Sequence, residues 1–388
     1  MLINDCPKVL IFGPEQRIFN MSLTKQELER YKRHTILPEL GVRGQEMLKS
    51  ASVLIVGTGG LGSPIAMYLA ASGVGTIGLI DFDVVDASNL QRQIIHKTRN
   101  VGLAKTKSAE ESIKEINPHV ELKLYNEALT SANALAIISS YDYVCDGTDN
   151  FATRYLVNDA CVISGKINVF GSIRQFEGQV SVFGTKDGPC YRCLFPEPPE
   201  PGTVPTCAEA GVVGVLPGVI GTLQATEVVK QITGIGKPLV GRLLNYDALN
   251  MHFNEIKFLK DPECPCCGTN ASIKELIDYD SFCGANVKPP LEDEISASEL
   301  KKWLNQTDAP LLIDVREPIE LMQGKICDSI NIPMQTIPVR MHEIPVDKPV
   351  VLYCHLGMRS LNVISFLKAK GYNNLINLTG GIDAWESI

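Results

Sequence analysis

One cysteine near the C-terminal end, Cys354, lies in the stretch VVLYCHLGMRS, between an apolar run and a helical pattern. A thiol in such a loop faces backbone amides and the positive end of a helix dipole, which favour an anion on sulfur. Arg359 follows after four intervening residues. Because this loop is short for a ring around a tetrahedral phosphate, we predict sulfur chemistry at Cys354. The simpler alternative is a thiol buried at the end of a strand.

Two pairs of cysteines have the spacing of metal-binding knuckles. Cys190 and Cys193 form one pair, and Cys264 and Cys267 form the other, with Cys266 between them. Four thiolates at this spacing suit a closed tetrahedral Zn²⁺ site, and closed four-sulfur sites are structural. The sequence therefore predicts a Zn²⁺ ion that fastens two distant loops. Four unliganded core cysteines would not explain the paired spacing.

A glycine-rich stretch in the N-terminal half, VLIVGTGGLGSPIAM, has the pattern of a phosphate-binding loop. Gly57, Gly59 and Gly62 let the backbone approach phosphates, whose charge is favoured at a helix N-terminus. We expect Ser63 to cap that helix, and Asp81, after the next apolar run, to bind a ribose hydroxyl. The pattern predicts a bound nucleotide and, taken alone, favours a dinucleotide.

The charged residues after the second predicted strand are not those of a dehydrogenase. Arg92 and Lys105 would converge on a triphosphate and stabilise the charge that develops when a carboxylate attacks its α-phosphorus. Asn89 lies in the same stretch, and Asp149 in CDGTDN follows a later strand, where a carboxylate can bind Mg²⁺. The alternatives are solvated charges at Arg92 and Lys105 and a helix cap at Asp149.

These residues need a scaffold, and short β-rich runs alternate with helical patterns in both halves of the chain. Such alternation is typical of parallel sheets with crossover helices. We expect an α/β protein with a Rossmann-like first domain and a smaller α/β second domain. The expected parts are an N-terminal extension at 1–22, the first domain at 23–270, a linker with Pro-Pro and an acidic run at 271–293, and the second domain at 294–388.

The composition narrows the class of protein. Of 388 residues, 45% are apolar and 21% are charged, as in a globular protein. The net charge of −8 argues against nucleic acid as a partner, because phosphate backbones are bound by clustered Lys and Arg. The uncharged run at 51–80 is rich in glycine, so we expect no membrane span. Charges near the N-terminus argue against a signal peptide, and we expect a cytoplasmic protein.

The stretches RYKRHTILPELG, GTGGLGSP, LIDFDVVDASNLQRQ, CDGTDN and CYRCLFP resemble the MoeB/ThiF family, relatives of ubiquitin-activating enzymes, over residues 28–268. The resemblance implies ATP rather than NAD, Mg²⁺, and a ubiquitin-like sulfur-carrier protein whose C-terminal Gly-Gly is adenylated. It also implies a homodimer in which Arg33 reaches the triphosphate of the partner subunit, and it gives the same zinc ligands. The ATP-site residues that it implies are Gly57, Gly59, Gly62, Asp81, Asn89, Arg92, Lys105 and Asp149.

The stretches LLIDVRE, YCHLGMRS and LTGGIDAW resemble a single rhodanese domain over residues 295–385. This resemblance implies a persulfide on Cys354, a structural pair of Asp314 and Arg316, and a role for Arg359 in binding an anionic sulfur donor. Cys207 lies in a Pro-rich stretch that resembles the crossover loop of the MoeB/ThiF family, where some members place a catalytic cysteine. The alternative for Cys207 is a thiol that packs within its loop.

The two resemblances imply one function on an α/β fold, in which a Rossmann-like adenylation domain with structural zinc precedes a rhodanese domain. ATP-dependent adenylation of the C-terminal glycine of a sulfur carrier would be followed by attack of the Cys354 persulfide, which gives a thiocarboxylate. Molybdenum cofactor biosynthesis is favoured, and thiamine, cysteine or tRNA thiolation stay open. The sulfur donor is thiosulfate or a cysteine desulfurase.

Two other hypotheses compete with this one. In the first, the protein is an adenylyltransferase whose rhodanese domain only docks a partner. In the second, it is a nucleotide-dependent dehydrogenase, but none of its six histidines has a recognisable catalytic setting. Met1 and Met21 are both possible natural starts.

Overall fold

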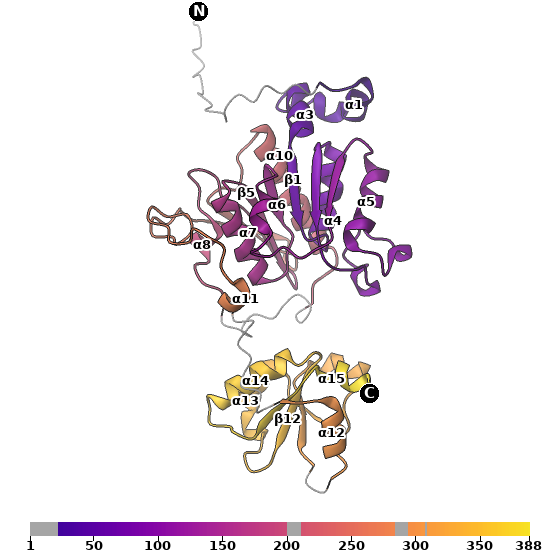
Figure 1. Cartoon of the computed structure of the whole chain (residues 1–388), viewed down its shortest axis with the longest axis vertical. Coiled ribbons are helices and arrows are strands. Elements are labelled where there is room, and N and C mark those ends of the chain that lie inside the picture. The colour runs from indigo at the N-terminus through magenta and orange to yellow at the C-terminus, as the bar shows by residue number, and fades with distance from the viewer. Residues whose placement is uncertain (1–21, 200–210, 284–293, 307–308) are drawn as a thin grey trace, which may run out of the picture. The chain divides into compact units, whose positions relative to one another are not determined.

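The computed structural model describes residues 22–199, 211–283, 294–306 and 309–388 (Figure 1). Residues 22–198 and 211–282 form one compact unit, and the described residues from 283 onward belong to a second. Each unit is built on a sheet of its own with helices between the strands, which confirms the expected α/β class.

The first unit contains an eight-stranded sheet in the order β3-β2-β1-β4-β5-β6-β7-β8. Strands β1 to β5 are parallel, and β6 to β8 extend the sheet with antiparallel pairs. The strand order reverses between β1 and β4, and ligands of such sheets bind outside the carboxyl ends of the strands at that point. The strands are β1 Ser52–Val56, β2 Thr76–Ile80, β3 Glu121–Tyr125, β4 Tyr143–Asp146, β5 Ile167–Arg174, β6 Glu177–Phe183, β7 Arg242–Asp247 and β8 His252–Lys257.

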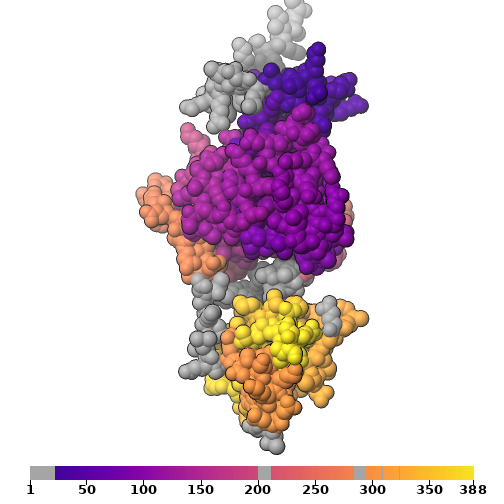
Figure 2. All heavy atoms as spheres, turned by 45° about the vertical axis from the view of Figure 1, so that its right-hand side comes forward, coloured from indigo at the N-terminus to yellow at the C-terminus, as the bar shows by residue number. Residues whose placement is uncertain are grey.

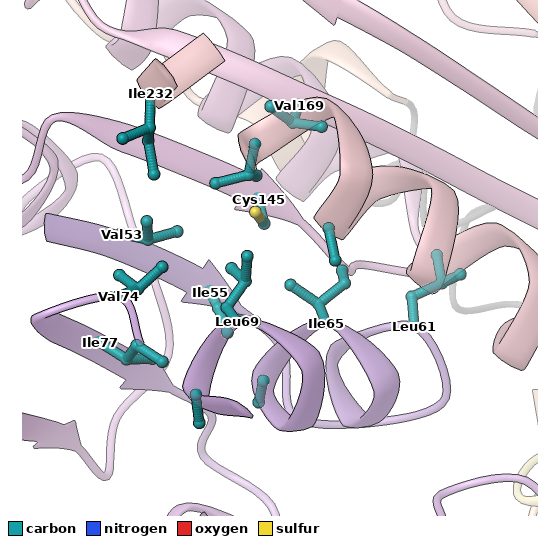
Figure 3. Packing of buried hydrophobic residues seen from close by; sticks show 14 of the residues in the cluster. Val53, Ile55, Leu61, Ile65, Leu69, Val74, Ile77, Cys145, Val169 and Ile232 are labelled. Atoms are coloured by element: carbon teal, nitrogen blue, oxygen red, sulfur yellow. The ribbon is translucent and has the colours of Figure 1, made fainter. Parts of the chain in front are cut away.

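The main core of this unit lies between the sheet and the helices α4 and α10 (Figure 3). Side chains alternate along a strand, so Val53 and Ile55 of β1 enter this core, whereas Leu54 is buried outside it. A strand buried in this way reads as a continuous apolar run, which explains SVLIV. The helices are α1 Lys25–Arg30, α2 Lys32–Thr35, α3 Gly41–Ser50, α4 Gly62–Ser72, α5 Lys105–Ile116, α6 Ala134–Ile138, α7 Phe151–Ile163, α8 Tyr191–Leu194, α10 Leu216–Thr233 and α11 Tyr279–Phe282, with short 3-10 turns η1 Ala87–Asn89 and η2 Thr98–Asn100.

The second unit contains a parallel five-stranded sheet in the order β11-β10-β12-β13-β9. Both faces of β12 are buried: Val350 and Leu352 belong to one apolar cluster, and Val351 and Tyr353 belong to another. The strands are β9 Glu294–Ile295, β10 Leu311–Asp314, β11 Ile330–Asn331, β12 Val350–Tyr353 and β13 Leu375–Leu378. The helices and 3-10 turns are α12 Ala297–Trp303, η4 Pro318–Gln323, η5 Met334–Thr336, α13 Ile337–Arg340, η6 Met341–Glu343, α14 Met358–Lys368 and α15 Gly381–Glu386.

The C-terminal end packs within the second unit. Lys301 of α12 donates a hydrogen bond from Nζ to the carbonyl oxygen of Ile388, and in Figure 2 the yellow C-terminal atoms lie beside the orange atoms of the start of this unit. The stretch 271–282, which the sequence analysis placed at the start of the linker, is held on the first unit by several hydrogen bonds, among them one from the amide of Ile273 to the carbonyl oxygen of Pro265. Ser131 donates to the carbonyl oxygen of Ile277, and the hydroxyl of Tyr279 donates to Asp159.

Among the described residues, no helix has the length and apolar character that a membrane crossing requires.

Candidate nucleotide, metal and sulfur sites

The glycine-rich loop connects β1 to α4 and depends on two of its glycines for its shape. Gly57 has φ +87°, a left-handed conformation that glycine tolerates best. A Cβ atom on Gly62 would lie 1.9 Å from the carbonyl oxygen of Gly57. At Gly59, by contrast, the nearest atom to an added Cβ is Nε2 of Gln93, at 3.5 Å. Gly59 therefore leaves space beside the loop, as a phosphate-binding surface requires.

The expected cap at Ser63 is wrong. Helix α4 begins at Gly62 with Leu61 as its N-cap residue, and the Ser63 hydroxyl donates backwards to the carbonyl oxygen of Gly59, at 2.6 Å. The N-cap residue Leu61 makes no side-chain hydrogen bond, but the amides of Ser63 and Ile65 donate to the carbonyl oxygens of Gly59 and Leu61, and Pro64 has no amide hydrogen. The positive end of the helix dipole favours an anion, so we expect phosphate at the glycine loop rather than on the amides of the first turn.

Asp81 holds the glycine loop from the end of β2. One carboxylate oxygen accepts hydrogen bonds from the backbone amide of Thr58, at 2.8 Å, and from its hydroxyl, at 2.9 Å. The other oxygen accepts from the amide of Asp83, at 3.0 Å. The structure thus shows Asp81 ordering the loop, and its contact with a ribose stays a prediction.

The predicted cations lie on segments that follow β2. Lys105 is the first residue of α5 and is buried, and its Nζ atom donates to the carboxylate of Asp83, at 2.7 Å. The side chain of Arg92 lies beside Gly60 and donates to the carbonyl oxygen of Ser88, at 3.2 Å. Asn89 accepts a hydrogen bond from the amide of Asp86 within the turn η1. Buried Lys105 is therefore no solvated surface charge, which overturns the simpler interpretation for that residue.

His96 is a residue of this site that the sequence analysis missed. Its imidazole is buried and lies between Thr58 of the glycine loop and Ser108 of α5. Nε2 is 3.1 Å from the carbonyl oxygen of Thr58, and Nδ1 is 2.9 Å from the hydroxyl of Ser108. Burial lowers the pKa of His96, so the neutral ring donates from Nε2 and accepts at Nδ1. Gln93, which faces the same loop, has a buried Oε1 atom with no partner among the described residues.

The segment CDGTDN contains two aspartates in different surroundings, of which Asp146 is buried and Asp149 is exposed. Asp146 ends β4 in full burial, which raises the pKa of its carboxyl group, and one of its oxygens accepts from the amide and hydroxyl of Thr148. Asn150, not Asp149, caps α7, because its side chain accepts from the amide of Thr153. The capping alternative for Asp149 is therefore wrong. Asp149 is exposed at the carboxyl edge of the sheet, where a divalent cation can reach it.

Three further positions from the sequence analysis are Arg33, Cys207 and Met21. Arg33 is exposed on α2, where a second subunit can reach it. Cys207 lies outside the described residues, as does Met21.

The four predicted zinc ligands come together. The sulfur atoms of Cys190, Cys193, Cys264 and Cys267 all lie within 4.8 Å of one another, and Cys266 is outside this quartet. Contacts between the two knuckles are as short as 3.4 Å. Sulfur hydrogen bonds, with Cys190 first among the partners, lower the pKa of Cys193 to about 6, whereas such bonds raise the pKa of Cys190. Four thiols this close fit a tetrahedral Zn²⁺ ion, whose charge allows all of them to ionise.

Arg192, between the first two ligands, anchors this knuckle. Its guanidinium is almost fully buried and makes bidentate hydrogen bonds to Asp159 of α7, the shortest at 2.8 Å. The hydroxyl of Tyr279 in α11 donates to the same carboxylate, at 2.8 Å. Arg192 also lies over the rings of Tyr155 and Phe282. One buried cation thus joins the knuckle, α7 and α11.

The sulfur site lies where β12 meets α14. Cys354 follows the last residue of β12 and is almost fully buried. Its sulfur accepts a hydrogen bond from the amide of Gly357, at 3.1 Å, and lies 3.6 Å from the hydroxyl of Ser360. Gly381, the first residue of α15, leaves no room for a side chain, because an added Cβ would lie 2.4 Å from the carbonyl oxygen of Cys354. The loop therefore encloses the thiol and directs a backbone donor at it.

Two arginines of this unit form ion pairs with carboxylates. Asp314 and Arg316 form a buried bidentate pair, and Arg316 also donates to the carbonyl oxygen of Gly324. Arg359, in the first turn of α14, makes two hydrogen bonds to the carboxylate of Glu320, at 2.8 and 2.7 Å. The sequence analysis missed Glu320, because no local pattern links residues that are so far apart in the chain.

Comparison with known proteins divides the chain in the same way. The sequence model of the ThiF family matches residues 31–266, and that of the rhodanese-like domain matches residues 296–388.

Three curated relatives resemble the chain over most of their own length. The probable adenylyltransferase/sulfurtransferase MoeZ of Mycobacterium tuberculosis is 47% identical, over 94% of both chains. The adenylyltransferase and sulfurtransferase MOCS3 of Bos taurus is 40% identical, over 94% of this chain and 87% of its own. The sulfur carrier protein adenylyltransferase of Thermus thermophilus is 53% identical, over 68% of this chain and 99% of its own.

Two solved structures share the fold of the larger unit. E. coli MccB matches with a TM-score of 0.57 at 21% identity, over 65% of this chain and 74% of MccB. PaaA matches with a TM-score of 0.54 at 22% identity, over 64% of this chain and 79% of PaaA.

Proposed function

The chain belongs to the ThiF family and carries a rhodanese-like domain at its C-terminal end, and we propose that its two units act in turn on one sulfur-carrier protein. The protein is an adenylyltransferase and a sulfurtransferase, as are its relatives that match both units. In our proposal it adenylates the C-terminal glycine of a ubiquitin-like carrier and then replaces the adenylate with sulfur.

The first stage uses the glycine loop. A carboxylate oxygen of the carrier bonds to the α-phosphorus of ATP, the bond to the bridging oxygen breaks, and pyrophosphate leaves. The glycine loop and the positive end of the α4 dipole hold phosphate oxygens, and Arg92 and Lys105 stabilise the charge that develops in the transition state. His96 and Asp81 keep Thr58 in place, and so keep the loop in one conformation. Mg²⁺ held by Asp149 would neutralise part of the phosphate charge.

The second stage uses Cys354. The terminal sulfur of a persulfide on Cys354 bonds to the acyl carbon of the carrier adenylate, and AMP leaves with the electron pair of the broken C–O bond. A second thiol then attacks the sulfur of Cys354, so that a disulfide forms and the carrier departs as a thiocarboxylate. Cys207 is our candidate for the second thiol, and Arg359 for binding an anionic donor, either thiosulfate or a persulfide delivered by a cysteine desulfurase.

The proposal includes the setting of the reaction. We propose that Zn²⁺ in the cysteine quartet is structural, that a cytoplasmic homodimer brings Arg33 to the neighbouring subunit, and that molybdenum cofactor biosynthesis is the pathway served. The domains are proposed to span residues 23–270 and 294–388.

The observation that carries the proposal is the presence in one chain of two prepared sites. One is a glycine loop that leads into the start of a helix, and the other is a buried thiol that faces a backbone amide. Each site supplies what the other lacks, because an acyl-adenylate is an electrophile and a persulfide is a nucleophile.

The test is intact-mass spectrometry of carriers that end in Gly-Gly, incubated with the protein, Mg-ATP and a sulfur donor. We expect the carrier to gain the mass of an oxygen-to-sulfur exchange with the wild-type protein, and only the adenylate with Cys354→Ala. Cys327→Ala, which removes an exposed cysteine of the same unit, should behave as wild type. If Cys354→Ala still thiolates the carrier, the second unit only docks a partner and the sulfur-transfer role is wrong.

A further inference from the structure

The ion pair between Arg359 and Glu320 is built into the sulfur site. Both side chains are mostly buried, with exposed fractions of 12% for Arg359 and 26% for Glu320. The carboxylate of Glu320 also accepts a hydrogen bond from the amide of Glu317, at 2.9 Å. Burial acts to raise the pKa of Glu320, but the bonds from Arg359 and from the Glu317 amide outweigh it and lower the pKa, so the carboxylate is charged.

Arg359 of this pair lies in the first turn of α14, the helix that begins shortly after Cys354. Arg359 directly precedes Ser360, whose hydroxyl lies 3.6 Å from the sulfur of Cys354. Glu320 comes from η4, a turn bracketed by Arg316, which donates to the carbonyl oxygen of Gly324 just beyond it. The carboxylate is therefore delivered to Arg359 by a second element that the buried Asp314–Arg316 pair fixes in place.

The pairing removes the guanidinium charge that an anionic donor would use. A bidentate carboxylate takes two of the donors of an arginine and cancels its field at short range. The other two arginines of the second unit are also paired, Arg316 with Asp314 and Arg340 with Glu343. We propose that Glu320 is a specificity-determining residue, which holds Arg359 in a neutral pair and thereby lowers the affinity of the sulfur site for small anionic donors.

This inference rests on the proposed transfer of sulfur to Cys354. With thiosulfate as donor, the thiolate of Cys354 bonds to the outer sulfur, the S–S bond of thiosulfate breaks, and sulfite leaves with its electron pair. The product is a persulfide on Cys354. Glu320 takes no part in this exchange of bonds, so its removal should change binding of the donor more than the rate of the chemical step.

The experiment compares full-length wild type with Glu320→Gln, in thiosulfate:cyanide sulfurtransfer and in loading of Cys354 followed by intact mass. The amide keeps the shape of the carboxylate but removes its charge. We expect the KM for thiosulfate to fall about tenfold, with kcat changed less than about twofold. The fall should be smaller for methanethiosulfonate, which carries a single negative charge. Glu343→Gln, which breaks the similar pair with Arg340, should leave the KM unchanged.

A double variant tests whether the gain in affinity for thiosulfate comes from the guanidinium of Arg359. Combining Glu320→Gln with Arg359→Gln should return the KM for thiosulfate close to the wild-type value. A gain that survives the loss of Arg359 would overturn the inference.

Wild-type protein gives a second test, which does not depend on the folding of any variant. Because the pair carries no net charge, the KM of the wild-type protein for thiosulfate should change less than about threefold between about 0.05 and 0.5 M salt. A rise of more than tenfold would show a cation open to the donor and would overturn the inference.

Two further outcomes separate the inference from the proposed function. Persulfide loading with the same KM in wild type and Glu320→Gln would overturn the inference alone. If no sulfur reaches Cys354 in either protein from any donor, the proposed sulfur transfer fails, and the inference fails with it.

Discussion

The Nε2 atom of His96 lies 3.1 Å from the carbonyl oxygen of Thr58, so the buried imidazole of His96 holds the glycine loop in place. On its other side the ring meets the hydroxyl of Ser108, at 2.9 Å. The loop and α5, the helix that begins with Lys105, are therefore connected through one imidazole. We expect the position of the phosphate-binding amides to depend on it.

Replacing His96 should weaken both ATP binding and the fold. His96→Ala leaves two buried groups without a partner, so we expect the free energy of unfolding to fall by about 1–3 kcal/mol. The KM for ATP in pyrophosphate exchange should rise, because the loop loses its support. Urea denaturation and exchange kinetics measure the two effects. His119→Ala, which removes an exposed histidine, is the control, and equal losses in both variants would contradict this role.

The same ring predicts a dependence on pH. Burial lowers the pKa of His96 in the folded protein, whereas the unfolded chain binds a proton near the ordinary value of 6.5. The stabilising contribution is therefore present above pH 6.5 and is lost as the pH falls toward the folded pKa. Denaturation of wild type and His96→Gln between about pH 5 and pH 8 checks this, because the difference between them should shrink at the acid end. A difference that grows on acidification would refute it.

The two glycines at positions 59 and 62 should respond to alanine in opposite ways. Gly59→Ala meets only a side-chain amide, so we expect a folded protein whose affinity for ATP is at least about tenfold lower. Gly62→Ala drives a methyl group into the carbonyl oxygen of Gly57, so we expect a loss of several kcal/mol in stability. Calorimetric titration and thermal unfolding distinguish them. Normal ATP binding by Gly59→Ala would show that phosphates lie elsewhere.

The neighbours Asp149 and Asn150 should separate ion binding from helix capping. Asn150→Ala removes the cap of α7 and should cost about 1 kcal/mol of stability with little change in the Mg²⁺ requirement. Asp149→Asn should leave stability within about 0.5 kcal/mol and raise the Mg²⁺ concentration needed for adenylation. Pyrophosphate exchange over a magnesium series, beside urea denaturation, gives both quantities. An unchanged magnesium response in Asp149→Asn would remove this residue from the metal site.

The cysteine quartet should bind one Zn²⁺ ion per chain, and Cys266 should be dispensable for it. Cys193→Ser removes a ligand, so we expect zinc to be lost and the unfolding temperature to fall by more than about 4 °C, since each kcal/mol shifts it by roughly 2–4 °C in a domain of this size. Cys266→Ser should keep the metal, because its sulfur lies outside the quartet. Elemental analysis and thermal unfolding test this. Zinc loss in Cys266→Ser alone would reassign the ligands.

The sequence predicted the parts of these sites whose spacing is local. The zinc quartet, the glycine loop and the strand that precedes Cys354 all follow from residue types within short stretches. The cap at Ser63 failed for a physical reason. A serine near a helix start can bond forward to an amide or backward to a carbonyl, and the tight approach of Gly62 to Gly57 selects the second.

The residues that the sequence analysis missed act across long stretches of chain. Glu320 meets Arg359 only because parallel strands bring η4 and α14 to the same edge of the second sheet. His96 belongs to no motif, and its role appears only once β1 and α5 are packed together. Asp81 also holds the loop through both of its oxygens, a role that the sequence analysis missed, and its contact with a ribose stays a prediction.

The buried guanidinium of Arg192 has a mechanical consequence. It ties the first zinc knuckle to α7 through Asp159, and Tyr279 binds the same carboxylate from α11, the last helix before residue 283. A pull along the chain from the second unit would therefore load the junction of knuckle, α7 and α11 before it reached any strand of the catalytic sheet. The metal knuckle is therefore placed to take up such a force before it reaches the glycine loop.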